Sequence, residues 1–129
     1  MAAAKPPKPT PAELEILQVL WAGGPRTVRE VQRVLNEKKP TGYTTALKML
    51  QIMTEKGLVV RDDRQRPQTY RARYPREQMQ SQLLHDLVQR VFGGSVKALV
   101  LQALAGRRSS PEELQEIERL LDRMGGQTK

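Results

Sequence analysis

One stretch of the chain constrains its fold more than any other, because it places a helix and two short strands in immediate succession. Apolar residues recur at helical spacing over 43–56, and Gly57 follows as a typical helix end. A short apolar strand over 58–61, a strongly charged turn and an alternating strand over 69–74 come next. A helix followed directly by a two-stranded ribbon is the order found in a winged helix.

Two further helices are predicted before this stretch, over 11–22 and 28–36. Each begins with a Thr-x-x-Glu sequence, at Thr10 and Thr27, which is the pattern of a capping box. The apolar faces of these helices match that of the third, so the three can share one core. We therefore expect a mainly α fold with a small β-wing, in which a winged helix-turn-helix DNA-binding domain occupies residues 10–75.

The ends of the chain and its last third have a different organisation. Residues 1–9 are rich in proline and weakly basic, which predicts a disordered arm. Residues 76–124 are expected to form a helical dimerisation domain, followed by a frayed tail over 125–129. Three amphipathic helices are expected within that domain, over 76–92, 96–105 and 110–124.

The dimerisation hypothesis depends mainly on the helix predicted over 96–105, which is apolar on much of its circumference. Such a helix must be buried on most sides. Its own chain offers only two neighbours, so the remaining side is expected to meet a second subunit; an intramolecular three-helix bundle is the alternative. The candidate interface residues are apolar residues of the three helices: Leu84, Leu87, Val88, Val91, Leu99, Val100, Leu101, Leu104, Ile117 and Leu121.

Electric charge is distributed unevenly along the chain. The net charge is +8 and the pI is about 10.2. Residues 1–74 carry 14 Lys and Arg against 7 Asp and Glu, whereas residues 75–129 carry 8 against 7. The N-terminal half is therefore the part suited to binding a polyanion, although a basic surface can also serve solubility alone.

Composition also argues against several classes of protein. The chain has no Cys, and His85 is its only histidine, so thiol chemistry, Cys-based zinc sites and a His cluster within one chain are excluded. No phosphate loop and no nucleophile–base pair is evident, so we expect neither an enzyme nor a bound cofactor or metal. The longest apolar run, 98–101, is too short to cross a bilayer, and residues 1–9 do not resemble a secretory signal. We expect a cytoplasmic protein without membrane insertion.

The outward face of the helix over 43–56 carries the side chains expected to contact double-stranded DNA. Thr and Lys can bond base edges or phosphates, and Gln can pair with adenine. Arginines at the tip of the wing and basic residues flanking the second helix are expected to contact phosphates or the minor groove. The alternative for each is a solvated surface position. The candidate residues are Tyr43, Thr44, Thr45, Lys48, Gln51, Arg64, Arg66, Arg29, Lys38 and Lys39.

A dimer would suit this function, because two recognition helices related by a two-fold axis read an inverted repeat. Two other functions remain open for a winged helix. A protein-interaction module would have a weakly basic recognition face, and Lys48 with the wing arginines argues against it. An RNA-binding module would expose aromatic side chains for stacking on bases, and this chain has few.

The chain resembles the BlaI/MecI penicillinase-repressor family of winged-helix regulators, which also includes the copper-responsive CopY repressors. The resemblance covers residues 9–124. It rests on the order and spacing of several segments, and these are PAELEILQVLW, TVREVQRVL, YTTALKML with EKGLV, TYRARY, FGGSVKALVLQAL and SPEELQEIERLL.

The resemblance implies a homodimeric transcriptional repressor. Its winged helix would bind a palindromic operator, and its C-terminal helices would form the dimer. It also implies release by a membrane sensor-protease that cuts within the dimerisation domain.

This chain departs from the family pattern at three places. Lys48 stands where the family often has a second Thr, and Ile52-Met53 replaces a common Arg-Leu pair, so the operator sequence does not carry over. The position of the cleaved Asn-Phe bond reads Gln102-Ala103. The metal-binding Cys pairs of the CopY branch are absent, which excludes a copper–thiolate switch.

Overall fold

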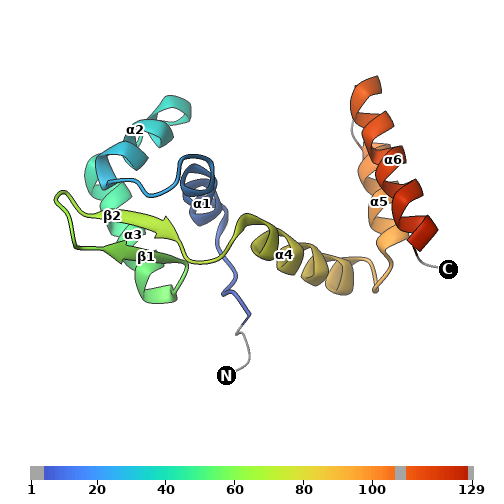
Figure 1. Ribbon diagram of the computed structural model, residues 1–129, viewed down its shortest axis with the longest axis horizontal. Coiled ribbons are helices and arrows are strands. Elements are labelled where there is room, and N and C mark those ends of the chain that lie inside the picture. The colour runs from blue at the N-terminus through green and yellow to red at the C-terminus, as the bar shows by residue number, and fades with distance from the viewer. Residues whose placement is uncertain (1–4, 107–109, 128–129) are drawn as a thin grey trace. The chain divides into compact units, whose positions relative to one another are not determined.

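The computed structural model describes residues 5–106 and 110–127, which divide into two compact units between His85 and Asp86. Figure 1 shows a chain of helices interrupted once by a two-stranded sheet. The elements are α1 (Pro11–Gly23), α2 (Val28–Lys38), α3 (Tyr43–Lys56), β1 (Val59–Asp62), β2 (Thr69–Ala72), α4 (Arg76–Val91), α5 (Val96–Gly106) and α6 (Pro111–Gln127). The expected mainly α fold with a small β-wing is confirmed.

Capping residues begin the first two helices, as the sequence predicted. The Thr10 hydroxyl accepts a hydrogen bond from the Glu13 amide at 3.2 Å, and the Glu13 carboxylate accepts one from the Thr10 amide at 2.9 Å. Thr27 and Glu30 make the same reciprocal pair at the start of α2. Each box satisfies amides that have no partner within the helix, and so sets where the helix begins.

The third helix ends at a glycine with left-handed backbone geometry. Gly57 has φ 84°, and the amide of the following Leu58 donates to the Met53 carbonyl at 2.9 Å. Only glycine adopts this conformation without a steric penalty. The reversal sends the chain directly from α3 into β1, which is what places the wing beside the helix (Figure 1).

The core of the first unit lies between α1, α2, α3 and one face of the sheet. Strands β1 and β2 are antiparallel, with Val59 opposite Ala72 and Asp62 opposite Thr69. Tyr70, only 2% exposed, is among the largest buried side chains. The other buried apolar residues of this core are Ile16, Leu17, Val19, Leu20, Val28, Val31, Ala46, Leu50, Met53, Leu58, Val59 and Met79.

A short third segment extends the wing. Arg26 pairs with Tyr70 through two backbone hydrogen bonds, of 3.0 and 2.8 Å, and so lies against the free edge of β2. The Trp21 indole donates to the Tyr74 carbonyl at 3.0 Å. These contacts tie the α1–α2 connection and the end of α1 to β2 and the residues that follow it, so they hold the wing against the helices on its β2 side.

The boundary between the units differs from the expected one after Pro75. Met79 is 1% exposed and belongs to the core of the first unit, and Leu83 packs against that core. The first half of α4 is therefore part of the winged-helix unit. A sequence can show that a helix starts at Arg76, but not which core its apolar face joins.

Two predictions about the ends of the chain are corrected. Pro6 and Pro9 are buried, so the part of the arm from Lys5 to Pro9 is packed rather than disordered; residues 1–4 lie outside the described residues. At the other end α6 continues through Gln127, past the point where a frayed tail was expected. Residues 128 and 129 lie outside the described residues.

A partly buried ion pair connects the start of α1 to the end of α3. The Lys56 ammonium lies 2.7 Å from the Glu13 carboxylate, which is 5% exposed. Burial raises the pKa of Glu13, but hydrogen bonds from Lys56 and Thr10 outweigh it and leave the pKa below its ordinary value of 4.5. The charged carboxylate therefore stabilises the fold.

We predict that Glu13→Gln lowers the free energy of unfolding by about 1–2 kcal/mol at pH 7, because it leaves Lys56 and a capping amide without their charged partner. Since folding lowers the pKa of Glu13, this stabilisation is present above the ordinary value of 4.5 and is lost as the pH falls through the lower folded value. Urea unfolding at several pH values measures the difference. Glu15→Gln, at an exposed position of α1, is the control. An equal loss of unfolding free energy in both variants, or a loss that does not depend on pH, would contradict a stabilising role for the charged Glu13 carboxylate.

The second unit begins within α4 and continues through α5 and α6. Ser95 caps α5 by accepting from the Ala98 amide at 3.0 Å, and Ser110 caps α6 by accepting from the Glu113 amide at 3.1 Å. Within this one chain, α5 has no buried residue and Leu101 is 57% exposed. None of the described helices is both long and apolar enough to cross a membrane.

The candidate interface residues fall into three groups. Val88 is only 5% exposed within the single chain, and its place in the interface stays a prediction. The side chain of Leu121 lies outside the described part of the structure. The remaining eight are exposed or half-buried, and these are Leu84, Leu87, Val91, Leu99, Val100, Leu101, Leu104 and Ile117.

Candidate nucleic-acid interface

The third helix turns one face to the core and the opposite face to solvent. Ala46, Leu50 and Met53 are fully buried against the other helices and the sheet. The five candidate residues of α3 point in other directions around the helix and are all exposed, and these are Tyr43, Thr44, Thr45, Lys48 and Gln51. The helix thus presents hydrogen-bonding side chains along a face that no other described element covers.

Three of the candidate residues come from different elements and meet around one hollow. Arg29 of α2, Tyr43 of α3 and Arg66 of the wing turn line a concavity of about 470 Å³ together with apolar atoms of Leu47. The Arg29 guanidinium lies 5.3 Å from the centroid of the Tyr43 ring, which holds both side chains in place. Two cations facing one hollow form a natural position for a phosphate group.

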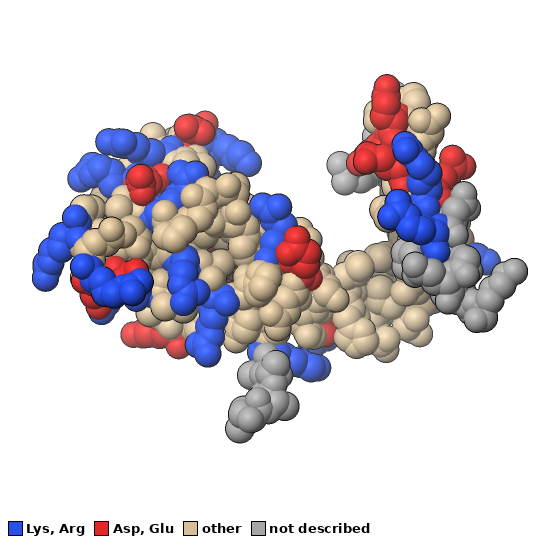
Figure 2. All heavy atoms as spheres, in the orientation of Figure 1, with Lys and Arg blue, Asp and Glu red and all other residues tan. Residues whose placement is uncertain are grey.

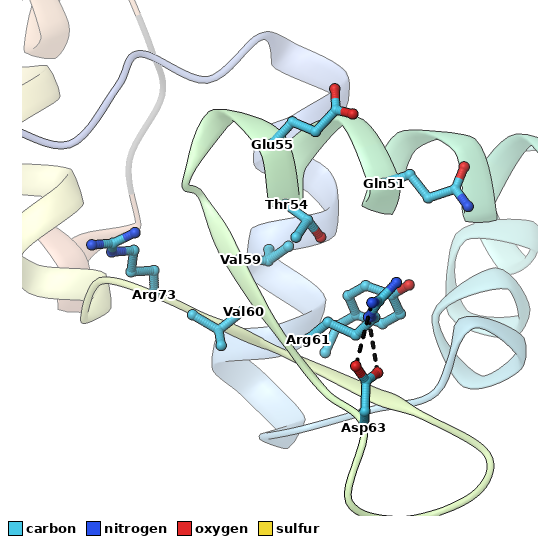
Figure 3. Close-up of a pocket in the computed structure, with 9 residues that line it drawn as sticks. Gln51, Thr54, Glu55, Val59, Val60, Arg61, Asp63 and Arg73 are labelled. Atoms are coloured by element: carbon cyan, nitrogen blue, oxygen red, sulfur yellow. Dashed lines mark hydrogen bonds and ion pairs between the residues drawn. The ribbon is translucent and has the colours of Figure 1, made fainter.

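A second hollow lies between the C-terminal half of α3 and the wing (Figure 3). It encloses about 610 Å³ and is lined by Gln51 from the helix and by Arg61, Asp63 and Arg73 from the wing side. Arg61 and Asp63 form an ion pair at 2.9 Å, drawn as dashed lines in Figure 3. Sequence reasoning did not single out Arg61 or Arg73, because their place in the same hollow as Gln51 depends on how the wing folds back against α3.

The two arginines at the wing tip differ in their surroundings. Arg64 donates twice to the Asp62 carboxylate, at 3.0 and 2.9 Å, and hydrogen bonds from Arg64 lower the pKa of Asp62 to about 2. Arg66 has no ion-pair partner within the described ranges. Arg66 therefore offers an uncompensated positive charge, whereas the charge of Arg64 is largely balanced. No local pattern in the sequence distinguishes these two arginines.

Lys38 and Lys39, at the end of α2, complete the set of candidates. Both are exposed, and both line a groove that also includes Thr45. Figure 2 shows Lys and Arg side chains spread over the visible face of the unit that contains α1, α2, α3 and the wing. All ten residues predicted from the sequence are exposed. Five of them lie on α3 itself, and the other five lie on α2, the α2–α3 turn and the wing.

No group of three or more Cys, His, Asp or Glu side chains in the described residues is arranged to hold a metal ion. What these residues present instead is an exposed polar helix with cations on its flanks. Such a surface is suited to contacting base edges and backbone phosphates together.

The fold and this surface define the class of protein. Three helices, a helix-turn-helix arrangement of α2 and α3 and a two-stranded wing make the first unit a winged helix-turn-helix domain. The sequence matches the penicillinase repressor family over residues 9–123, nearly its whole length, and the chain therefore belongs to that family. Members of this family are DNA-binding transcriptional repressors and not enzymes.

The chain is also similar to individual proteins. The penicillinase repressor of Bacillus licheniformis is 25% identical over 118 residues, which cover 92% of each chain. The solution structure of the Bacillus licheniformis BlaI monomeric form in complex with the blaP half-operator matches 57% of this chain and 90% of its own, with a TM-score of 0.51 and 24% identity. A MarR family protein from Bacillus stearothermophilus matches 94% of this chain and 76% of its own, with a TM-score of 0.49 and 23% identity.

Proposed function

We propose that this protein represses transcription as a homodimer that binds an inverted-repeat operator sequence-specifically. The observation that carries the proposal is the exposed polar face of α3, flanked by cations on the wing and on α2. The structure of BlaI with a half-operator, on the same fold, supports DNA as the partner. The family of this chain supports repression as the outcome of binding.

We assign the base-reading role to Thr44, Thr45 and Lys48, which lie in the first half of α3. The N-terminal part of a recognition helix is the part that enters the major groove. Gln51 lies further along the helix and would contact either an adjacent base or the sugar–phosphate backbone. Lys48 suits the N7 and O6 acceptors of guanine, and Thr suits either a base or a phosphate.

The remaining candidates are assigned to the DNA backbone. A phosphate in the hollow between Arg29, Tyr43 and Arg66 would receive charge-assisted hydrogen bonds from both guanidinium groups. Lys38 and Lys39 would contact a phosphate on the other side of α3. Contacts of this kind position the protein on the duplex but carry no sequence information.

The wing tip allows a prediction that separates two neighbouring arginines. Arg66→Ala should reduce the slope of log K against log salt by about 0.9 for each half-site bound, the value for one lost phosphate contact. Arg64→Ala should reduce it by less, because Asp62 already balances that charge. Binding of both variants to one duplex across a salt series measures the slopes. If Arg64→Ala has the larger effect, the ion pair opens on binding and the assignment is wrong.

The dimer is proposed from apolar surface that one chain leaves uncovered. Leu84, Leu87 and Val91 are exposed at helical spacing along α4, and α5 has no buried residue although its sequence is largely apolar. Pairing of these helices with a second copy would remove that surface from water, at about 25 cal/mol per Å². It would also present two copies of α3, as reading an inverted repeat requires.

The release step that the family resemblance implies would involve a membrane sensor-protease acting at Gln102-Ala103. Both residues are exposed, and their peptide bond lies in the middle of α5. A helical bond must unfold locally before it can enter an extended protease cleft. Gln-Ala also differs from the Asn-Phe bond that the resemblance implies. Our proposal therefore covers DNA binding and dimerisation and leaves the inducing signal open.

RNA binding through stacking is disfavoured by the same surface. Tyr43 is the only aromatic residue on α3, and its ring already packs against Arg29. Base stacking in single-stranded RNA typically uses two or three exposed aromatic side chains on one surface. A double-stranded DNA partner fits the polar helix face better.

Selection of bound duplexes from a randomised DNA library tests the proposal. We expect enrichment of an inverted repeat whose half-site centres lie about one helical turn, roughly 10 base pairs, or a multiple of it apart. Enrichment of no sequence, or of one without two-fold symmetry, would contradict it. A parallel selection with single-stranded RNA should enrich nothing.

A further inference from the structure

A groove on the first unit has features that the DNA-binding function does not require. It lies between α1, α2 and the start of α3, and encloses about 460 Å³. Its larger apolar lining residues are Val19, Val34, Leu35 and Met49, of which Val19 is buried and the other three are half-buried. We call it the α1–α2 groove. Its volume lies within the range of sites that bind small organic molecules.

One wall of the α1–α2 groove is held by a set of hydrogen bonds. Thr41 lines the groove. Its carbonyl accepts a hydrogen bond from the Gln32 side-chain amide at 2.8 Å, and its backbone amide donates one to the Asn36 side-chain oxygen at 2.9 Å. Its hydroxyl donates to the Lys39 carbonyl at 2.8 Å. The turn is therefore fixed before any ligand arrives, so binding would cost little conformational entropy.

The rim of the groove carries more positive than negative charge. Lys38 and Lys39 line it, and neither has an ion-pair partner among the residues that the structure describes. Glu15 is the one acidic residue in the lining. Two cations beside an apolar floor complement a molecule that has an apolar body and a single anionic group.

We propose that the α1–α2 groove binds a small amphipathic monocarboxylate, such as an aromatic acid. The apolar body lies against Val34, Leu35 and Met49, and the carboxylate pairs with Lys38 or Lys39. The single carboxylate is specified by Glu15, which would repel a second anionic group in the same groove. The chain itself would then carry a sensor site within its winged-helix unit.

Occupation of the groove would weaken DNA binding, a consequence that rests on the proposed function. Thr45 lines the same groove and is one of the residues assigned to base reading. Lys38 and Lys39 would pair with the ligand instead of a phosphate. A carboxylate in the groove therefore competes with DNA for three contacts on one side of α3.

Titration of the full-length protein with naphthalene-2-carboxylate, in the absence of DNA, tests the binding site. Calorimetry should show saturable binding, about tenfold tighter than that of the uncharged naphthalene-2-methanol, because one charge-assisted hydrogen bond is lost with the alcohol. Ala22→Phe should abolish binding, because Ala22 is an exposed residue of the lining and a phenyl ring there fills the groove. Gln18→Trp, from the same wall, provides a second block should Ala22→Phe not fold.

A matched pair of charge variants checks the rim. Lys38→Gln should weaken binding of the carboxylate but not of the alcohol, and Arg33→Gln, which removes a charge from α2 outside the groove, should change neither. The proposed site would be wrong if Ala22→Phe and Gln18→Trp both bound naphthalene-2-carboxylate as the wild type does. It would also be wrong if the wild type bound the carboxylate and the alcohol with equal affinity.

DNA competition is measured separately. Naphthalene-2-carboxylate should lower the DNA affinity of the wild type and leave that of Ala22→Phe unchanged. An undiminished wild-type affinity at saturating ligand would overturn the competition. Failure of the protein to bind any duplex specifically would overturn the proposed function and leave the groove result standing.

Discussion

Leu101→Glu should convert the dimer to monomers and weaken binding to an inverted-repeat operator by about 100- to 10,000-fold, the range over which linking two binding modules raises their combined affinity. Leu101 is 57% exposed in the single chain and lies on a helix with no buried residue. A carboxylate there would have to be buried without a partner when two copies meet. The monomer itself should stay folded, because Leu101 contributes little to the core of its own chain.

Gln102→Glu is the matched control, since it adds the same charge at the next position of α5, where the native residue is polar and exposed. Sedimentation should find monomers only for Leu101→Glu, and circular dichroism should find both variants helical. Affinity for a single half-site should be alike in the two variants. A dimer that persists in Leu101→Glu would place the interface away from α5.

Lys48→Ala should weaken operator binding by about 1–3 kcal/mol for each half-site, the magnitude of a specific base contact. Lys48 is exposed on α3, one turn after Thr44 and Thr45, and has no ion-pair partner among the described residues. If it reads a base, the loss should be large on the operator and small on a scrambled duplex. If it contacts only phosphate, both duplexes should lose affinity alike.

The control for Lys48→Ala is Lys97→Ala, which removes an equal charge from α5 outside the proposed DNA-binding surface. The affinities of Lys97→Ala for the operator and for the scrambled duplex should stay close to those of the wild type. A comparable loss in both lysine variants would mean that net charge, rather than a position on α3, governs affinity. An unchanged affinity of Lys48→Ala would remove this residue from the base-reading set.

Local signals in the sequence predicted much of the fold. The Thr10 and Thr27 boxes placed the starts of α1 and α2, and Gly57 placed the end of α3. These signals involve residues within a few positions of each other, so the chemistry that produces them is visible in the sequence. The apolar periodicity of α3 likewise distinguished buried Ala46 and Leu50 from its exposed face.

Features that depend on contacts distant in the sequence were not predicted. The bridge between Arg26 and Tyr70 and the burial of Met79 join segments whose approach is set by packing rather than by local pattern. The pairing of Arg64 with Asp62 is close in sequence, yet it depends on the conformation of the wing turn. Pro6 and Pro9 are buried, although the proline-rich composition of residues 1–9 favoured disorder.

The site was predicted as a list of exposed residues rather than as an arrangement. The structure brings Arg29, Tyr43 and Arg66 around one hollow, and it places Lys38 and Thr45 in another. The sequence alone could not do this, because each group combines different elements. The assignment of individual residues to bases or phosphates remains a proposal that the variants above address.

Fluorescence anisotropy with the DNA upstream of its own gene, across a salt series and against a scrambled duplex, tests the central claim most directly. We predict tight binding by two protomers to the native fragment and weak binding to the scramble, with a difference that persists as salt increases. Equal binding to both duplexes, lost in parallel as salt rises, would contradict sequence-specific repression at that site and leave only attraction of a basic surface for a polyanion.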